Sequence, residues 1–322
     1  MTQDLRPLIG DLTPAQVADH LELIGDADAA GRIRHAGASG QVFGRVFGRE
    51  TYLATGVLVG FVEHGSEATS AIVGGHQVTP EEDLRDTPLK ITLEQFFVQR
   101  YPGLGRHRVL VDFSGQNQAA ADSEEIKFAL TLEAADGSAA GVHGKPIFTG
   151  VRVGTDGLNF RGQTTNVRST DDDLVLDALG SDAFRQGLSL LTTAQPVLKP
   201  FVGLATGALK AIYRRSRNCP VFRFDLGLDF SERTQATRLR CGSYVIVQHD
   251  EHTWDWANFR FDRGTRTVLR GDGQGPLALN YLVIGVERFA GTPKTDGRPG
   301  RDTSRKASLT GSNRGHGTRT RT

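Results

Sequence analysis

Apolar and polar residues alternate along several short stretches of the chain, and a period of two residues is typical of a β-strand with one buried face. The alternation is clearest from Phe222 to Phe230, where large apolar residues occupy every second position. Ile126 to Glu133 alternates in the same way, which predicts a strand with one face in a core and the other in water. Tyr244 to Gln248 is almost continuously apolar, so we predict that this strand is buried on both faces.

Turn-forming residues separate these stretches and favour antiparallel pairing of neighbouring strands. Residues 154–157 lie between two β-forming segments, 147–153 and 158–167, and predict a hairpin there. Residues 263–264 predict a second hairpin, whose first strand begins at Phe259. The chain contains 39 glycines, a content that suits short strands joined by turns better than long helices.

Two stretches carry the signals of a helix start. Thr13 to Gln16 combines a capping threonine, a proline in the first turn and a glutamine three residues after the cap, which predicts a short N-terminal helix. Thr92 to Gln95 has the same spacing between threonine and glutamine. It predicts a second helix that continues to about Tyr101, where the following Pro-Gly pair ends it.

A longer helical block is predicted from about residue 172 to residue 215. Three consecutive aspartates at 171–173 place negative charge where a helix begins, and prolines at 196 and 200 divide the block. The last helix of the block, about residues 197–213, carries one apolar face. That face comprises Phe201, Leu204, Ala205, Ala208 and Ile212.

Many antiparallel strands without regular βα alternation predict a mainly β protein, an antiparallel β-sandwich with an inserted helical block (about 172–215) and a short N-terminal helix. The expected divisions are an N-terminal helical segment at 1–38 and the sandwich domain at 39–289. Residues 290–322 are rich in Gly, Thr, Arg and Ser, and Leu309 is their one large aliphatic residue. Because such a segment buries little apolar surface, we expect a disordered basic tail.

Charge is distributed unevenly along the 322 residues. The net charge is +1, but residues 291–322 hold eight basic and two acidic residues and so carry +6. The preceding residues therefore carry −5. A mildly acidic body with a basic tail is not the profile of a dedicated nucleic-acid-binding domain, so we do not expect nucleic acid as a partner. The oligomeric state is left open.

The chain lacks the local signatures of several common activities, although a catalytic triad built from distant residues stays open. The two cysteines, Cys219 and Cys241, have no zinc-site spacing, and the chain lacks GxSxG, Walker A and HExxH motifs. We therefore expect no cofactor. Residues 1–12 lack the apolar run of a signal peptide, and no stretch reaches 18 consecutive apolar residues. The expected location is the cytoplasm, including the periphery of a membrane.

The first candidate site is a stretch without acidic residues. From Ala183 to Phe224 there is no Asp or Glu, although the chain contains 37. An amphipathic helix that ends in a basic cluster is typical of a segment attracted to an anionic membrane surface. The surface-binding residues that we predict are Lys199, Lys210, Arg214, Arg215 and Arg217.

This stretch has a simpler interpretation as well. The apolar face of the helix packs on the sandwich, and the basic residues at its C-terminus interact favourably with the helix dipole. The sequence leaves both interpretations open.

The second candidate site is the segment 248–256, which contains both tryptophans. Trp254 and Trp256 are two residues apart, so in a strand they share a face and form an aromatic platform for a ligand. His249 and His252, with a neighbouring carboxylate, are candidate ligands for a divalent metal. The alternative is that the tryptophans close the end of a core and that the polar residues form a solvated turn.

These features lead to three hypotheses about function. The first is a non-enzymatic binding protein whose basic helical segment engages an anionic surface, either a membrane or a protein partner, in its sharpest form as a membrane-acting effector. The alternative is a metal-assisted hydrolase that uses the loop from His249 to Trp256. The third is a structural subunit. An outward-facing basic helix favours binding, whereas a pocket that brings His249, His252 and a carboxylate together favours the enzyme.

Overall fold

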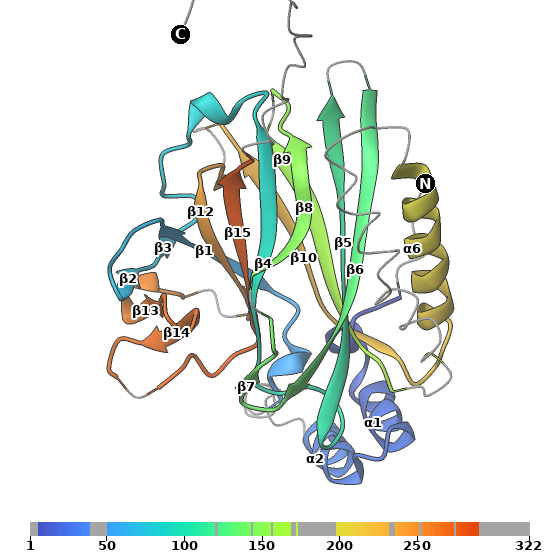
Figure 1. The fold of residues 1–322 in the computed structure, drawn as a ribbon. Coiled ribbons are helices and arrows are strands. Elements are labelled where there is room, and N and C mark those ends of the chain that lie inside the picture. Colours follow the sequence, from blue (N-terminus) through green and yellow to red (C-terminus); the bar gives the residue numbers. More distant parts are fainter. Residues whose placement is uncertain are drawn as a thin grey trace, which may run out of the picture. The chain divides into compact units, whose positions relative to one another are not determined.

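The structure is a computed structural model, and it describes residues 6–38, 50–119, 122–142, 144–155, 157–168, 172, 198–231, 236–250, 253–273 and 275–289. The protein is mainly β, with three sheets and few helices (Figure 1). The helices are η1 (Ile9–Asp11), α1 (Pro14–Leu23), α2 (Ala27–Ala38), η2 (Thr51–Leu53), η3 (Glu82–Leu84), α6 (Leu198–Tyr213) and η7 (Trp256–Asn258). The strands are β1 (Val57–Glu63), β2 (Thr69–Ala71), β3 (Val73–Gly74), β4 (Pro88–Val98), β5 (Arg106–Ala119), β6 (Asp122–Ala135), β7 (Ser138–Ala139), β8 (Lys145–Arg152), β9 (Leu158–Asn166), β10 (Cys219–Asp229), β11 (Thr237–Arg238), β12 (Gly242–Gln248), β13 (Phe259–Asp262), β14 (Thr267–Arg270) and β15 (Tyr281–Arg288).

Pairing between strands is antiparallel, as the turn pattern predicts, and within the described ranges the single exception is the short β10–β11 pair. The largest sheet has seven strands in the order β3-β1-β12-β15-β4-β7, with β8 also paired to β4. The second sheet has the order β11-β10-β9-β5-β6, and the third has the order β14-β13-β2.

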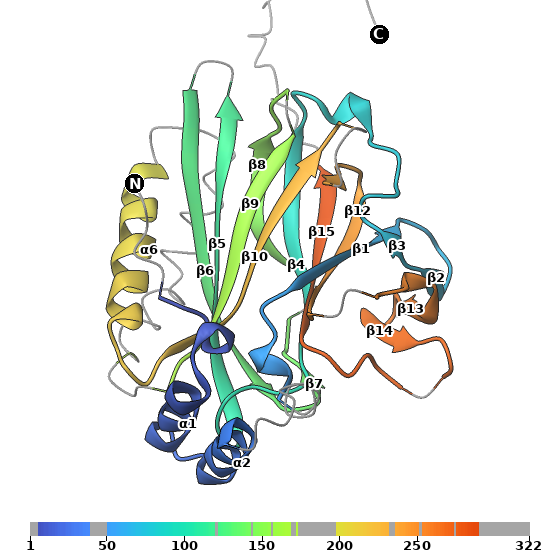
Figure 2. The same ribbon diagram turned by 180° about the vertical axis from the view of Figure 1, so that it is seen from behind.

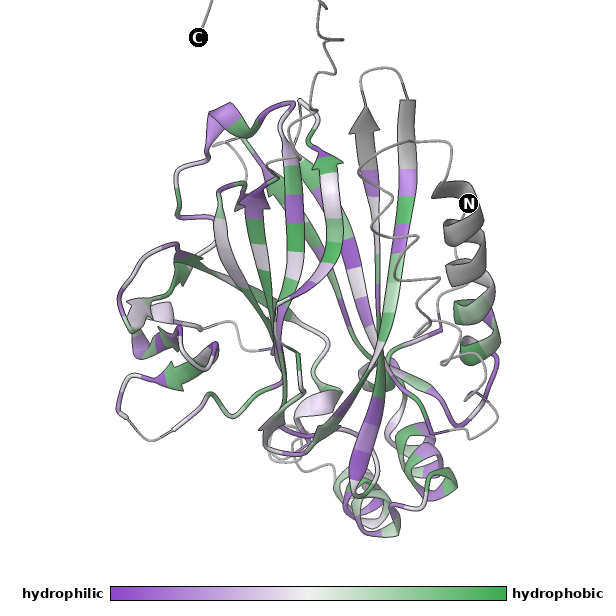
Figure 3. Ribbon diagram, viewed as in Figure 1, coloured by the Kyte–Doolittle hydropathy of each residue, from purple (hydrophilic) through white to green (hydrophobic). Residues whose placement is uncertain are grey.

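The two larger sheets share one core. Apolar residues of β4, β12 and β15 belong to the same buried cluster as those of β5, β6, β9 and β10. The alternation from Phe222 to Phe230 is confirmed, because β10 buries these apolar residues and leaves Asp225 and Gly227 exposed. Bands of apolar and polar residues also alternate along β4 (Figure 3).

A second apolar cluster lies on the other side of the seven-stranded sheet, where the three-stranded sheet covers it. Along β12, Tyr244 and Ile246 belong to the main core, whereas Val245 and Val247 pack in the second cluster with Phe261 of β13. Every residue of β12 is buried. The prediction of a strand buried on both faces is therefore confirmed, and the small sheet supplies the reason.

The predicted N-terminal helix is present as α1, and its start has the expected capping box. The Thr13 hydroxyl accepts a hydrogen bond from the Gln16 amide at 3.4 Å, and the Gln16 side chain accepts one from the Thr13 amide at 3.0 Å. Helices α1 and α2 bury Val17, Leu21 and Ile33 in the main core. These helices therefore contribute to the same core as the two larger sheets.

The prediction of a helix over 92–101 is wrong, because β4 occupies this region as a strand between β15 and β8. The pairing with β15 shifts between Leu93 and Gln95, which leaves Glu94 as the extra residue of a bulge. Leu93 and Phe96 therefore both reach the main core although they are three positions apart. The bulge thus creates a helix-like spacing inside a strand.

The hairpin predicted around residues 154–157 is also wrong. Strand β8 pairs with β4 of the seven-stranded sheet, whereas β9 pairs with β10 and β5 of the five-stranded sheet. Gly154 and Gly157 form only an isolated bridge, so the turn carries the chain from one sheet to the other. Turn-forming residues of this kind occur both in hairpins and in connections between two sheets. The hairpin predicted around 263–264 is confirmed by the β13–β14 pair.

The predicted helical block is only partly visible. Its last helix is present as α6, but residues 173–197 lie outside the described residues, so the block as a whole is not confirmed. The tail predicted at 290–322 also lies outside them.

The outer face of β6 is not left entirely to water as predicted, since Lys127 and Ala129 are buried there. None of the helices in the described ranges is long and apolar enough to cross a membrane.

Candidate functional site

Helix α6 lies next to β6, beside the five-stranded sheet (Figures 1 and 2). Side chains of the helix are described from Thr206 onward. Leu209 and Ile212 are buried, and they pack in a cluster of five buried residues that is separate from the main core. The other three members are Leu110, Ala129 and Val167. Burying these two aliphatic side chains contributes about 3–6 kcal/mol to holding the described half of the helix.

Most of the predicted basic residues lie on the exposed side of this helix or just after its C-terminal end. We call Lys210, Arg214, Arg215 and Arg217 the basic end of α6, and all four are exposed. Within the described part of the chain, no carboxylate forms an ion pair with Lys210, Arg214 or Arg217. Arg215 lies 3.7 Å from the buried carboxylate of Asp172. Lys199 belongs to the first turn of α6, and its side chain is outside the described residues.

The sheet surface beneath α6 is unusually polar for a helix contact. The Tyr213 hydroxyl donates a hydrogen bond of 2.5 Å to the Asp112 carboxylate of β5. Lys127 of β6 donates one of 3.4 Å to the hydroxyl of Thr206. Burial raises the pKa of Asp112 to about 6, although Tyr213, Arg223 and Lys127 act in the opposite direction. The carboxylate is therefore held where its charged form is disfavoured.

Two threonine hydroxyls add to this polar surface. Thr131 and Thr165 flank Leu110 on the strands at either side of β5. Both hydroxyl oxygens are buried. That of Thr165 interacts with the Tyr213 hydroxyl, whereas that of Thr131 has no hydrogen-bond partner among the described residues. A buried polar group without a partner costs about 1–3 kcal/mol, so Thr131 offsets part of the apolar contact.

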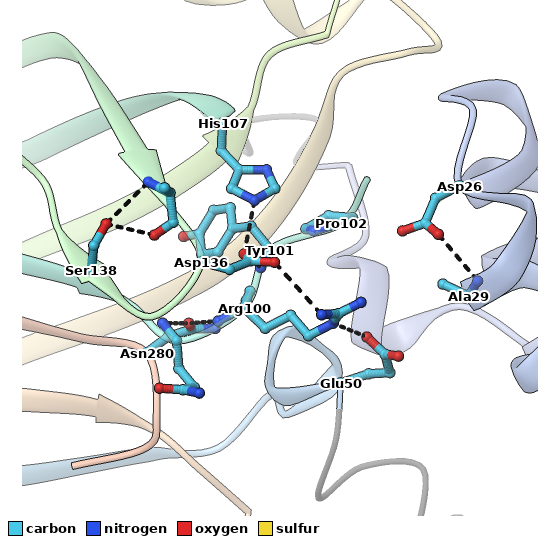
Figure 4. A network of polar contacts seen from close by, with 12 residues as sticks. Asp26, Ala29, Glu50, Arg100, Tyr101, Pro102, His107, Asp136, Ser138 and Asn280 are labelled. Carbon is cyan, nitrogen blue, oxygen red and sulfur yellow. Dashed lines mark hydrogen bonds and ion pairs between the residues drawn. The ribbon is translucent and has the colours of Figure 1, made fainter. Parts of the chain in front are cut away.

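A second polar cluster, at the end of the core near α2, contains a histidine–aspartate pair (Figure 4). Arg168 lies 2.9 Å from Nδ1 of His107, and because a guanidinium only donates, Nδ1 accepts this hydrogen bond. Nε2 therefore carries the proton and donates it to Asp136 at 2.8 Å. His107 is fully buried, so neither ring nitrogen is free to exchange a proton with a substrate. This pair orders the structure and is not arranged as a catalytic base.

The same cluster continues through two arginines to a buried glutamate. Arg100 contacts Asp136 at 3.6 Å and Glu50 at 2.7 Å, as Figure 4 shows. Arg32 of α2 pairs with the other oxygen of Glu50 at 2.7 Å. Glu50 is only 1% exposed. The network therefore ties α2 to the chain that follows β4.

The two predicted platform tryptophans belong to an aromatic cluster. Trp254 stacks on Phe259 with ring centroids 4.7 Å apart, and it meets Trp256 and His249 edge to face, each at 5.3 Å. Trp256 also covers Gly60, where a Cβ atom would lie 2.9 Å from its ring. Both tryptophans are partly buried against the second apolar cluster. They close one end of that core, and their role in ligand binding stays a prediction.

The predicted metal site is visible only in part. His249 is partly buried beside Trp254, and His252 lies outside the described residues. The neighbouring Asp250 accepts hydrogen bonds from the amides of Thr55 and Gly56, at 2.9 and 2.5 Å. In the ranges that the structure describes, no group of three or more His, Cys, Asp or Glu residues is arranged to hold a metal. Metal binding by His249 and His252 stays a prediction.

A pocket of about 650 Å³ lies next to β1 and β2. Its two arginines already have partners, because Arg240 pairs with Glu63 at 2.7 Å and Arg263 donates to the Ser70 hydroxyl at 3.0 Å. Arg240 is therefore neutralised by a carboxylate, whereas Arg263 donates to neutral oxygens and keeps its positive charge.

The Asp112–Tyr213 contact was not predicted from the sequence, since its residues are 101 positions apart. One signal was available: Asp112 interrupts an apolar strand at Val111-Asp112-Phe113. Comparison with known proteins does not extend these observations: no protein-family model matches this chain, and no curated protein or solved structure is significantly similar to it.

Proposed function

We propose that this protein is a non-enzymatic binding protein, built on an antiparallel β-sandwich, that engages an anionic membrane surface through α6. The supporting observation is the exposure of the basic end of α6, where Lys210, Arg214 and Arg217 have no acidic partner among the described residues. Arg215 and Lys199 extend the same basic segment. A protein partner or a nucleic acid is the alternative occupant of this surface.

The charge of this segment is sufficient for reversible attachment. Each basic residue near an anionic bilayer contributes about 1 kcal/mol, and the attraction weakens with salt because ions screen it over a Debye length. The apolar character of α6 favours a bilayer over nucleic acid. Base stacking needs free aromatic rings, but Tyr213 of α6 is bonded to Asp112, and both tryptophans lie in the separate Trp254–Trp256 cluster.

Co-sedimentation with vesicles tests this proposal. The parent is expected to bind phosphatidylserine-containing vesicles at low salt and to bind neutral phosphatidylcholine vesicles weakly. The triple variant K210A/R214A/R217A loses about 3 kcal/mol, so its affinity for anionic vesicles is expected to fall about 100-fold. Arg215 is left in place because it contacts Asp172.

The matched control removes three other exposed arginines, R106A/R161A/R260A, which changes the net charge equally. A truncation after Phe289 separates the tail from α6. An equal loss of binding in the control contradicts the assignment to α6, and so does complete loss in the truncation. If the parent does not bind anionic vesicles at all, the proposed membrane partner is wrong.

A further inference from the structure

Helix α6 is amphipathic, and in its docked position only the apolar side contacts the sheet. The basic end faces solvent, whereas Leu209 and Ile212 face the sheet. With 16 residues, the helix is shorter than the roughly 20 residues that span a bilayer. It is long enough to lie in the headgroup boundary, with its apolar face down and its basic side chains toward the lipid phosphates.

The surface beneath the described half of the helix includes polar groups. Asp112 presents a carboxylate to α6, and the Thr131 hydroxyl is buried close by without a hydrogen-bond partner in the described chain. In its docked position the apolar face of α6 therefore meets a surface that is only partly apolar, whereas in a bilayer the same face meets the acyl chains just below the headgroups.

We propose that α6 leaves the five-stranded sheet and inserts Leu209 and Ile212 into the headgroup boundary of an anionic bilayer, with the partly buried Asp112 carboxylate weakening the docked position. This inference rests on the proposed function, because it assigns the bilayer as the partner of the same helix. To the basic end of α6 it adds a second surface that contacts the bilayer, the face that packs on the sheet. It also adds a cause for the release of α6 from the sheet.

Three elements that pack near Asp112 each bring a charged or titratable side chain close to it. Tyr213 reaches it from α6, Lys127 from β6 and Arg223 from β10. Arg223 is itself engaged, since its Nε donates to Gln163 of β9 at 2.8 Å. These partners reduce the cost of the charge, but the pKa of Asp112 remains raised to about 6. The protonated carboxyl therefore favours docking, and docking weakens as the pH rises through about 6.

Amide hydrogen exchange at pH 5 and pH 8 measures this effect, with protection factors used to remove the intrinsic pH dependence. From an Asp112 pKa of 3.8 in the released state and about 6 in the docked state, we expect protection across 206–213 to be about tenfold higher at pH 5. D112N keeps an oxygen that accepts from Tyr213 but removes the charge. Its protection is expected to be independent of pH, about 15-fold higher than that of the parent at pH 5 and about 150-fold higher at pH 8.

D225N is the matched control, because Asp225 lies exposed on the same sheet and pairs with Arg161 at 2.6 Å. Its protection across 206–213 is expected to follow that of the parent. Equal protection of the parent at pH 5 and pH 8, or of parent and D112N at pH 8, overturns the release of α6 through Asp112.

Vesicle binding at pH 8 in high salt separates insertion from surface attraction, because salt screens charge and does not weaken apolar contact. The parent is expected to keep part of its binding, and D112N to lose that part. If high salt removes the binding of parent and D112N equally, insertion is wrong while charge-based binding stands. If K210A/R214A/R217A keeps the pH-dependent protection but does not bind, release and attachment are confirmed as separate steps.

Discussion

Replacing Glu50 with Ala is expected to lower the free energy of unfolding by about 3–5 kcal/mol, the cost of breaking a buried ion pair from one side. Glu50 is 1% exposed and pairs with both Arg32 and Arg100. Without it, Arg32 loses its acidic partner among the described residues, and Arg100 keeps only the longer contact to Asp136. Urea unfolding followed by circular dichroism measures the change.

The matched control is Glu82→Ala, which removes an equally short ion pair at the surface. Glu82 and Arg85 are 2.7 Å apart, and both side chains are at least 40% exposed. Because exposed pairs contribute little, the expected loss is below about 1 kcal/mol. If E50A and E82A are equally stable, the network around Glu50 does not hold α2 in place.

The sequence predicts strands well where a single face is buried, and less well where a strand is irregular. The period of two in β10 reflects a regular strand with one face in the main core. In β4 the bulge at Glu94 disrupts that period, and the Thr-x-x-Gln spacing then resembles a capping box. Local propensity indicated a helix there, but pairing with two neighbouring strands determined the structure.

Connections between sheets are harder to predict than the strands themselves. Gly157 has a φ of +105°, and a Cβ there would lie 2.0 Å from the Leu228 carbonyl oxygen, so only glycine fits this turn. The sequence shows the glycine but not which sheet the next strand joins. That choice depends on contacts with β10, about 70 residues later.

The candidate site was predictable only where it is continuous in sequence. The basic end of α6 lies within eight residues and follows from the absence of acids between 183 and 224. The polar surface beneath the helix comes from β5, β6 and β9, and the network around His107 joins segments near residues 32, 50, 100, 136 and 168. Such sets form only when the tertiary structure brings distant residues together.

Replacing Phe113 with Ala is also expected to cost about 3–5 kcal/mol of unfolding free energy, the usual range for a large aromatic in a core. Phe113 is 1% exposed, and its ring lies 6.3 to 6.5 Å from those of Phe128, Phe160 and Phe224. Gly162 lies between Phe113 and Phe224 in the strand register. A Cβ there would come within 2.2 Å of the Phe224 ring, so the two rings fill the space above this glycine.

Two further variants make the Phe113 experiment quantitative. F113L removes less volume than F113A and is expected to lose less stability, because the cost grows with the cavity that remains. Leu104→Ala is the control, since Leu104 is 61% exposed and its truncation is expected to change stability by no more than about 0.5 kcal/mol. A loss in F113A no larger than that in L104A would show that these rings do not form the centre of the core. A graded loss places the main stability of the protein in the core between the two larger sheets.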